Sequence, residues 1–293
     1  GLFFWEGITA LSTPAPSGLR ARVESLGGSF LSVLEQAGAF LLLFLAILRR
    51  LPILFARPRL VAAQVHFLGN YSLAIILVSG LFVGLVLGLQ GYYTLRRYGS
   101  EEALGLLVAL SLVRELGPVV TALLFAGRAG TALTAEIGLM KAGEQLSAME
   151  AMAVDPVARV LAPRLAGGLI AVPVLATLFS AVGIMGGWLV GVGLIGVDQG
   201  AFWSQMSGGV AFYDDILNGL VKAIVFGLVV TQIALYFGYS ARPTPEGVSR
   251  ATTATVVVGS LAVLGLEFQS ISELMGRQFQ KCHPLKPLMH YLQ

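Results

Sequence analysis

Three ionisable residues lie inside long apolar stretches of the chain, where a charge needs a specific reason: Arg114, Glu115 and Lys222. At the centre of a membrane-spanning helix a charge costs roughly 2.5–3.5 kcal/mol on insertion scales, so such residues usually bind one another or a ligand. Adjacent helical residues point in different directions. We therefore expect Arg114 and Glu115 to reach different neighbours, with Lys222 meeting Glu115 from another helix or subunit.

Two interpretations of these charges stay open. In the first, they line a polar path for a charged headgroup, because Arg and Lys hold phosphate through charge-assisted hydrogen bonds. Arg114 and Lys222 are the only basic residues within the expected spans, so at least one is expected near the headgroup. Glu115 would then neutralise the positive charge while no lipid is bound. In the second interpretation, ion pairs among these residues only lock the helices together.

The chain offers no motif for nucleotide binding or catalysis. A Walker A loop needs Gly-Lys before Ser or Thr, and the four lysines follow Met, Val, Gln and Leu. One cysteine, Cys282, and three histidines do not suggest a metal cluster. We predict no enzyme, no metal site and no cofactor in this chain, so that any ATP that drives it binds a partner ATPase.

The elements that must position these charges are predicted to be membrane-spanning helices. Of the 293 residues, 56% are hydrophobic and 12% are charged, whereas soluble domains carry about 25% charged residues. Apolar runs of spanning length predict about five spans, near 70–95, 103–125, 165–195, 216–239 and 253–268. The expected fold is an all-α membrane protein.

Glycines on two of these spans predict close packing between helices. Gly80, Gly84 and Gly88 share one face of the first span, and Gly187 and Gly191 repeat the spacing in the third. Small residues four apart let helix backbones approach closely in membranes.

The segments around the spans are more polar. Residues 1–26 are interpreted as a loose leader and 269–293 as a polar tail of unknown role, which leaves one membrane domain at 27–268. The apolar stretch at 30–50 contains Glu35 and ends in two arginines. This pattern favours an N-terminal helix lying in the membrane interface over a spanning one.

The distribution of basic residues predicts the orientation. Six Lys/Arg precede the first span and four lie in 128–164, whereas 196–215 has none but has three Asp. By the positive-inside rule, the first two segments face the cytoplasm and 196–215 faces the opposite side.

The cytoplasmic segment 143–156 has the pattern of a short amphipathic helix. Leu146, Met149 and Ala153 recur at helical spacing against polar neighbours, and Pro156 ends the pattern. Such a helix suits docking onto an ATPase, and a solvated connector is the alternative. The residues assigned to coupling are Gly143, Glu144, Leu146, Met149, Glu150 and Asp155.

Three stretches of the chain together resemble the MlaE/YrbE-type ABC transporter permeases. They are GLFVGLVLGLQGYYTL in the 81–95 region, LVALSLVRELGPVVTALLFAGRAGTALTAEIGLMKAGEQLSAMEAMAVDP at 107–156, and SRATTATVVVGSLAVLGLEF at 249–268. The resemblance covers about residues 60–268 and makes 27–268 a permease domain. The first 18 residues and 269–293 depart from the family pattern.

The resemblance implies a homodimeric permease in the inner membrane of a diderm bacterium. It implies four partners besides the phospholipid substrate: a second copy, a cytoplasmic ABC ATPase, a STAS-domain subunit and a periplasmic hexamer of an MCE-domain protein. Such a complex moves phospholipids between inner and outer membranes and maintains outer-membrane lipid asymmetry. By position, the resemblance assigns a lipid cavity to Leu87, Thr94, Tyr98, Arg114, Glu115 and Lys222, and the coupling helix to 143–156.

Two other functions fit the residues without the resemblance. One is an ion-coupled secondary transporter that uses Glu115 and Lys222 as a proton relay. The other is a non-transporting membrane assembly factor, in which the buried charges only hold subunits together. Nothing in the pattern suggests nucleic-acid binding.

Overall fold

The computed structural model describes residues 19–52 and 58–282, which form helices and short connections without a strand. Its principal elements are α2 (Leu19–Arg50), α3 (Pro58–Arg96), α4 (Leu104–Leu110), η4 (Ser111–Leu116), α5 (Gly117–Phe125), η5 (Ala126–Gly130), α6 (Thr131–Ala142), α7 (Gln145–Ala151), η6 (Val157–Leu161), α8 (Ala162–Trp188), η7 (Leu189–Leu194), α9 (Gln199–Gly209), η8 (Phe212–Ile216), α10 (Leu217–Ser240) and α11 (Pro245–Cys282). A short 3₁₀ turn, η3 (Glu101–Ala103), precedes α4.

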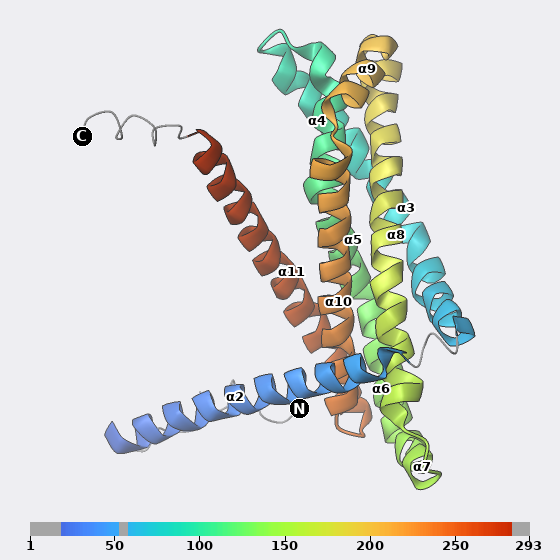
Figure 1. Ribbon diagram of the computed structural model, residues 1–293, viewed down its shortest axis with the longest axis vertical. Helices are drawn as coiled ribbons and strands as arrows, with labels where there is room; N and C mark the ends of the chain where they lie inside the picture. The colour runs from blue at the N-terminus through green and yellow to red at the C-terminus, as the bar shows by residue number, and fades with distance from the viewer. Residues whose placement is uncertain (1–18, 53–57, 283–293) are drawn as a thin grey trace, which may run out of the picture.

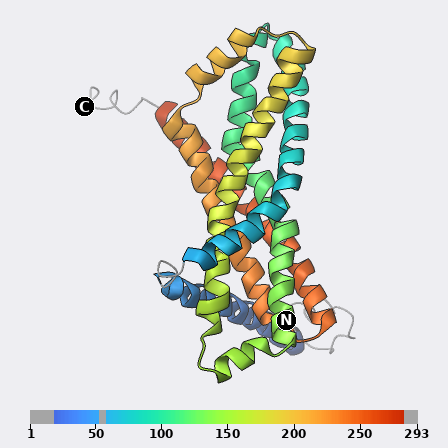
Figure 2. The same cartoon turned by 90° about the vertical axis from the view of Figure 1, so that its right-hand side faces the viewer.

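Five helical rods among the described residues are long and apolar enough to cross a membrane: Pro58–Arg96, Glu101–Ala142, Val157–Leu194, Phe212–Ser240 and Pro245–Ser270. This confirms the predicted all-α membrane protein with five spans. The rods bundle lengthwise, with α9 at one end and α7 at the other (Figures 1 and 2).

The second rod is much longer than the sequence predicts. The hydropathy pattern predicts a span at 103–125 and a polar cytoplasmic segment at 127–164, but the helix continues to Ala142. Arg128 and Glu136 therefore lie on the rod itself. Their polarity resembles that of a loop, although both are half-buried against neighbouring helices. The expectation that Arg114 and Lys222 are the only basic residues within the spans is wrong, because the rods contain others, among them the half-buried Arg128 and the buried Arg164.

The terminal segments differ from the expected leader and tail. Helix α2 begins at Leu19, inside the expected leader, and α11 continues through Gln269 to Cys282. Residues 1–18 and 283–293 lie outside the described residues. Helix α2 is not among the five spanning rods, and it crosses the lower end of the bundle at a steep angle (Figure 1). Its location in the membrane interface stays a prediction.

The closest packing in the bundle joins α3 to α8. A Cβ atom added to Gly84 would overlap the backbone carbonyl of Gly183. One added to Gly88 would lie 3.0 Å from both the Cα and the carbonyl oxygen of Gly187. Gly80, Gly84 and Gly88 therefore approach the α8 backbone closely, as predicted, whereas a Cβ atom on Gly191 would meet the side chain of Leu104.

Helix α11 packs more loosely. It lies beside α10 near its start and leans away toward its C-terminal end (Figure 1). Only 28% of its most apolar window is buried, against 56% for the rod that contains α10. A buried hydroxyl pair, Thr134 to Thr255 at 2.8 Å, joins α11 to α6.

Candidate membrane site and family

The second rod carries three of its half-buried charges on wide helical turns. The π-helical segment η4 holds Arg114 and Glu115, and η5 holds Arg128. Turns of π-helix are rare and recur at functional sites, because the extra residue changes the direction of the side chains. Another such turn, η8, holds Asp215 at the start of the fourth rod.

Lys222 on α10 lies at the centre of a buried charge cluster. Its side chain is 7% exposed, and Nζ lies 2.9 Å from Oε2 of Glu115 and 3.0 Å from Oε1 of Glu267. The predicted meeting of Lys222 with Glu115 is confirmed, and it occurs within one chain. One ammonium group is thus shared by two carboxylates from two different helices.

The third partner of Lys222 is a backbone carbonyl. Nζ donates to the carbonyl oxygen of Arg114 at 3.2 Å. In an α-helix that oxygen would accept from the N–H four residues later, but position 118 is a proline and has no N–H. Pro118 therefore leaves an acceptor that the lysine can use.

Arg114 turns to a different partner, as its position beside Glu115 predicted. Its Nη1 lies 3.4 Å from Oδ1 of Asp215, whose side chain is 8% exposed. The other oxygen of Asp215 accepts from the backbone N–H of Ala211 at 2.7 Å. The Arg114 side chain keeps 30% of its surface exposed, so it is more accessible than Lys222.

Sequence reasoning missed two members of this cluster, Glu267 and Asp215. Glu267 had a signal, because it is the only charged residue in the apolar run 253–268. Asp215 had none that distinguished it from Asp198 and Asp214 in the same acidic segment. Within the described parts of the chain, no group of His, Cys, Asp and Glu side chains is placed to hold a metal ion.

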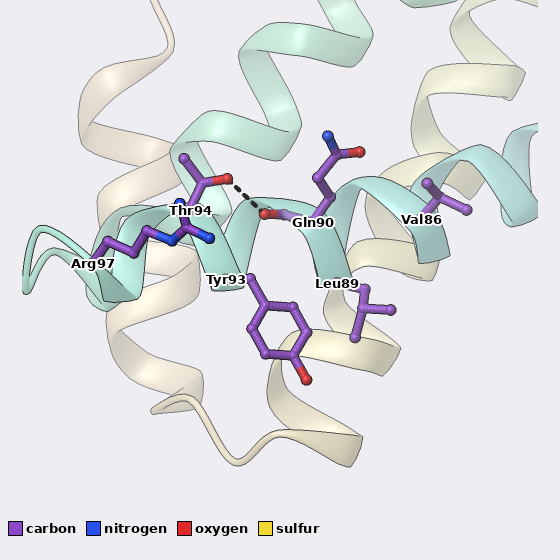
Figure 3. A pocket seen from close by; sticks show the side chains of 6 residues that line it. All are labelled: Val86, Leu89, Gln90, Tyr93, Thr94 and Arg97. Atoms are coloured by element: carbon purple, nitrogen blue, oxygen red, sulfur yellow. Dashed lines mark hydrogen bonds between the residues drawn. The ribbon is translucent and has the colours of Figure 1, made fainter.

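The three residues assigned to a cavity on the first span have different environments. Thr94 lines an open concavity on the exposed face of α3, together with Val86, Leu89, Gln90, Tyr93 and Arg97 (Figure 3). The Thr94 hydroxyl donates to the carbonyl oxygen of Gln90 at 2.9 Å. Leu87 is half-buried against the core, and Tyr98 is 79% exposed just beyond the helix.

The segment assigned to coupling folds as the short helix α7 between two sharp turns. Gly143 follows α6, and Glu144 and Ala153 adopt positive φ values of 55° and 58°. The predicted apolar face is divided: Leu146 is buried inside the chain and Met149 is half-buried, whereas Glu150 is exposed.

An exposed apolar residue and an ion pair complete this end of the bundle. Met152 is 68% exposed directly after α7. Asp155 pairs with Arg50 at the end of α2, and it also accepts from the backbone N–H of Val157 at 3.0 Å. The coupling segment is thus tied to the helix that crosses the bundle.

Five apolar rods with a charge cluster among them define a multi-pass membrane protein. The model of the family described as Permease MlaE matches residues 61–271. The chain belongs to the MlaE permease family, as its resemblance implied.

Named relatives agree with this membership. The chain is 62% identical over 217 residues to the "Intermembrane phospholipid transport system permease protein MlaE" of Haemophilus influenzae, covering 74% of this chain and 83% of the relative. It is 37% identical over 205 residues to a "Probable ABC transporter permease protein" of Rickettsia typhi, covering 70% and 79%. A chloroplastic protein of Arabidopsis thaliana, "TRIGALACTOSYLDIACYLGLYCEROL 1", is 28% identical over 205 residues, covering 70% and 58%.

Proposed function

We propose that this chain is the permease subunit of an ATP-driven complex that moves phospholipids between the inner and outer membranes of a diderm bacterium. The observation that carries the proposal is the 62% identity to a relative named for intermembrane phospholipid transport. On this proposal the chain works as a homodimer in the inner membrane and maintains outer-membrane lipid asymmetry. ATP binds the partner ATPase, and a STAS-domain subunit and an MCE-domain hexamer complete the complex.

The proposed orientation places α7 in the cytoplasm and α9 in the periplasm. Arg50, Lys141, Arg159, Arg242 and Arg250 lie toward the α7 end, whereas the α9 end has Arg96 and Arg97 together with Asp198, Asp214 and Asp215. This asymmetry follows the positive-inside rule. Cysteines introduced at Gly143 and Gln199 should react with an impermeant thiol reagent from opposite sides, and reaction of both from the periplasm would reverse the orientation.

Within the charge cluster, we assign different roles to the two cations. Lys222 is buried and surrounded by three oxygen atoms, which suits a structural ion pair. Arg114 is partly exposed and has one carboxylate partner at 3.4 Å. A phosphate can approach Arg114 while the Asp215 pair remains, so Arg114 is the candidate for headgroup contact and the concavity at Thr94 for apolar contact.

The test is reconstitution of the chain with its co-purified partners into vesicles that contain a fluorescent phospholipid. ATP should drive lipid transfer, and a non-hydrolysable analogue should not. Arg114→Gln should lower transfer at unchanged protein yield, with the exposed Arg242→Gln as the matched control. Transfer that needs a proton gradient and no ATP would instead indicate an ion-coupled transporter.

The apolar surface at α7 is proposed to dock the ATPase. Met152 is the most exposed apolar side chain of this segment, and Met149 lies half-buried beside it. A glutamate at either position puts a charge into an apolar contact. Met152→Glu should abolish co-purification of the ATPase, and Met149→Glu should do so to a smaller extent. Tyr213→Glu, which changes an exposed residue at the opposite end, is the control, and intact assembly of all three variants would refute the docking role.

A further inference from the structure

Arg128 differs from the other arginines of the bundle. Three arginines on the spanning rods are buried or half-buried among the described residues: Arg114, Arg128 and Arg164. Arg114 has Asp215 at 3.4 Å, and Arg164 has Glu136 at 2.5 Å. In the part of the chain that the structure describes, no carboxylate lies within ion-pair distance of Arg128, and its Nη1 is buried without a hydrogen-bond partner.

The neighbours of Arg128 supply an aromatic face but no negative charge. Its guanidinium carbon lies 5.1 Å from the ring centroid of Tyr71 on α3. The hydroxyl of Thr131, one turn away, is bonded to the carbonyl oxygens of Gly127 and Arg128 at 2.8 and 2.9 Å. A cation over an aromatic ring is attracted by the ring, but the buried Nη1 of Arg128 still has no acceptor. A half-buried guanidinium with one buried N–H group left without an acceptor favours an anionic ligand.

The site is open to the outside of the bundle. Tyr71 is 61% exposed. A Cβ atom added to Gly127, next to the arginine, would meet no atom within 4 Å. A ligand can therefore reach the guanidinium from the surface of the bundle.

Tyr71 is also the first residue of an exposed apolar stripe along α3. The stripe follows helical spacing, and its members are 46–61% exposed: Tyr71, Ile75, Val78, Phe82, Val86, Leu89 and Tyr93. At 1.5 Å per residue, Tyr71 and Tyr93 are about 33 Å apart, close to the ~30 Å hydrocarbon thickness of a bilayer. The two tyrosines thus match the two aromatic belts of a membrane protein.

This spacing fixes the depth of Arg128. It lies at the Tyr71 end of the stripe, which is the cytoplasmic end in the proposed orientation. From Tyr71 to Phe82 the helix rises about 16 Å, roughly half of the hydrocarbon core and thus one leaflet. A lipid whose headgroup meets Arg128 has room for its acyl chains along Ile75, Val78 and Phe82.

We propose that Arg128 and Tyr71 form a binding site for the phosphate of an anionic phospholipid in the cytoplasmic leaflet, with its acyl chains along the α3 stripe. This proposal deepens the proposed function, because it adds a cytoplasmic-leaflet lipid site to the periplasmic concavity near Thr94. The recognising chemistry is a phosphate oxyanion, which a lipid headgroup or free phosphate can supply. The apolar stripe selects the lipid.

The test is native mass spectrometry of the purified full chain with added phosphatidylglycerol. Arg128→Gln should weaken retention of one lipid about tenfold, whereas Arg250→Gln, an exposed arginine toward the same end, should not. Tyr71→Leu should weaken retention by roughly threefold, because the guanidinium loses the ring that positions it, whereas Tyr71→Phe should retain the lipid. If the Arg128→Gln protein does not insert into the membrane, the test is the comparison of lipid retention between Tyr71→Leu and Tyr71→Phe, because Tyr71 is exposed.

A second arm adds excess inorganic phosphate. Unchanged lipid retention supports the lipid as ligand, and displacement from wild type but not from Arg128→Gln would overturn that assignment in favour of free phosphate. Equal retention by Arg128→Gln and Arg250→Gln would overturn the site itself. Neither arm needs an ATPase, so failure here leaves the proposed transport untouched, and failure of ATP-driven transfer leaves this site untouched.

Discussion

The α3–α8 contact and the α10–α11 contact hold the bundle together in opposite ways. The first brings backbones together at Gly84 and Gly183, where not even a methyl group fits. The second depends at its wider end on the ion pair of Lys222 with Glu267, while α11 leans away (Figure 1). Close backbone packing cannot open gradually, because its contacts are lost within a fraction of an ångström. Long charged side chains tolerate small displacements of a helix, so the α11 side is the less tightly constrained of the two contacts.

Enlarging Gly84 should damage the bundle more than any change to its charges. A leucine at this position would overlap the carbonyl of Gly183, so α3 and α8 would have to separate. The expected loss is about 5 kcal/mol or more, the size of a whole domain's stability, and is measured as loss of monodisperse protein in detergent. Gly69→Ala, on the same helix with no atom within 4 Å of the new Cβ, should express normally. A well-folded Gly84→Leu protein would show that the α3–α8 contact can also open, and so would contradict the difference drawn between the two contacts.

Removing Lys222 should be the next most damaging change. Lys222→Ala leaves Glu115 and Glu267 facing each other without a cation, and removing one partner of a buried ion pair costs about 3–5 kcal/mol. The thermal unfolding temperature should fall. Complex yield and phospholipid transfer should be measured on the same preparations. If yield and transfer fall together, Lys222 has a structural role. Normal yield with lost transfer would instead indicate that Lys222 contacts the lipid headgroup.

The two carboxylates should partly substitute for each other. Glu115→Gln leaves Lys222 with Glu267 at 3.0 Å, and Glu267→Gln leaves it with Glu115 at 2.9 Å, so each should cost only about 1 kcal/mol. The double variant removes both counter-charges and should cost clearly more than the sum. Thermal unfolding of the four proteins forms a double-mutant cycle. Additive effects would show that the lysine is not shared.

Much of this molecule could be predicted from its sequence. Apolar runs gave the number of spans, because a bilayer imposes both length and hydropathy. The pairing of Lys222 with Glu115 followed from the cost of leaving a charge unpaired in a span. The glycine spacing indicated close packing, and the structure supplied its partners, which include Gly183.

What the sequence did not reveal depends on tertiary contacts. The second rod reaches Ala142 because neighbouring helices cover Arg128 and Glu136, whereas hydropathy alone places such residues in water. The wide turns that carry Arg114 and Arg128 follow no periodicity that distinguishes them from ordinary helix. Leu146 was assigned to the docking face by helical spacing, but α7 packs that side against the chain. Spacing predicts which residues share a face and not which partner the face meets.

Pro118 limits what side-chain substitutions can reveal about the surroundings of Lys222. Since Pro118 has no N–H to donate to the carbonyl of Arg114, which accepts from Lys222, part of the binding site for the ammonium group belongs to the main chain. Replacing Glu115 and Glu267 one at a time leaves that backbone oxygen in place. Such variants therefore measure the contribution of the carboxylates to binding Lys222, but not the contribution of the main chain. Pro118→Ala would restore an N–H that competes for the oxygen, which makes a residue without charge or polar side chain a member of the electrostatic cluster.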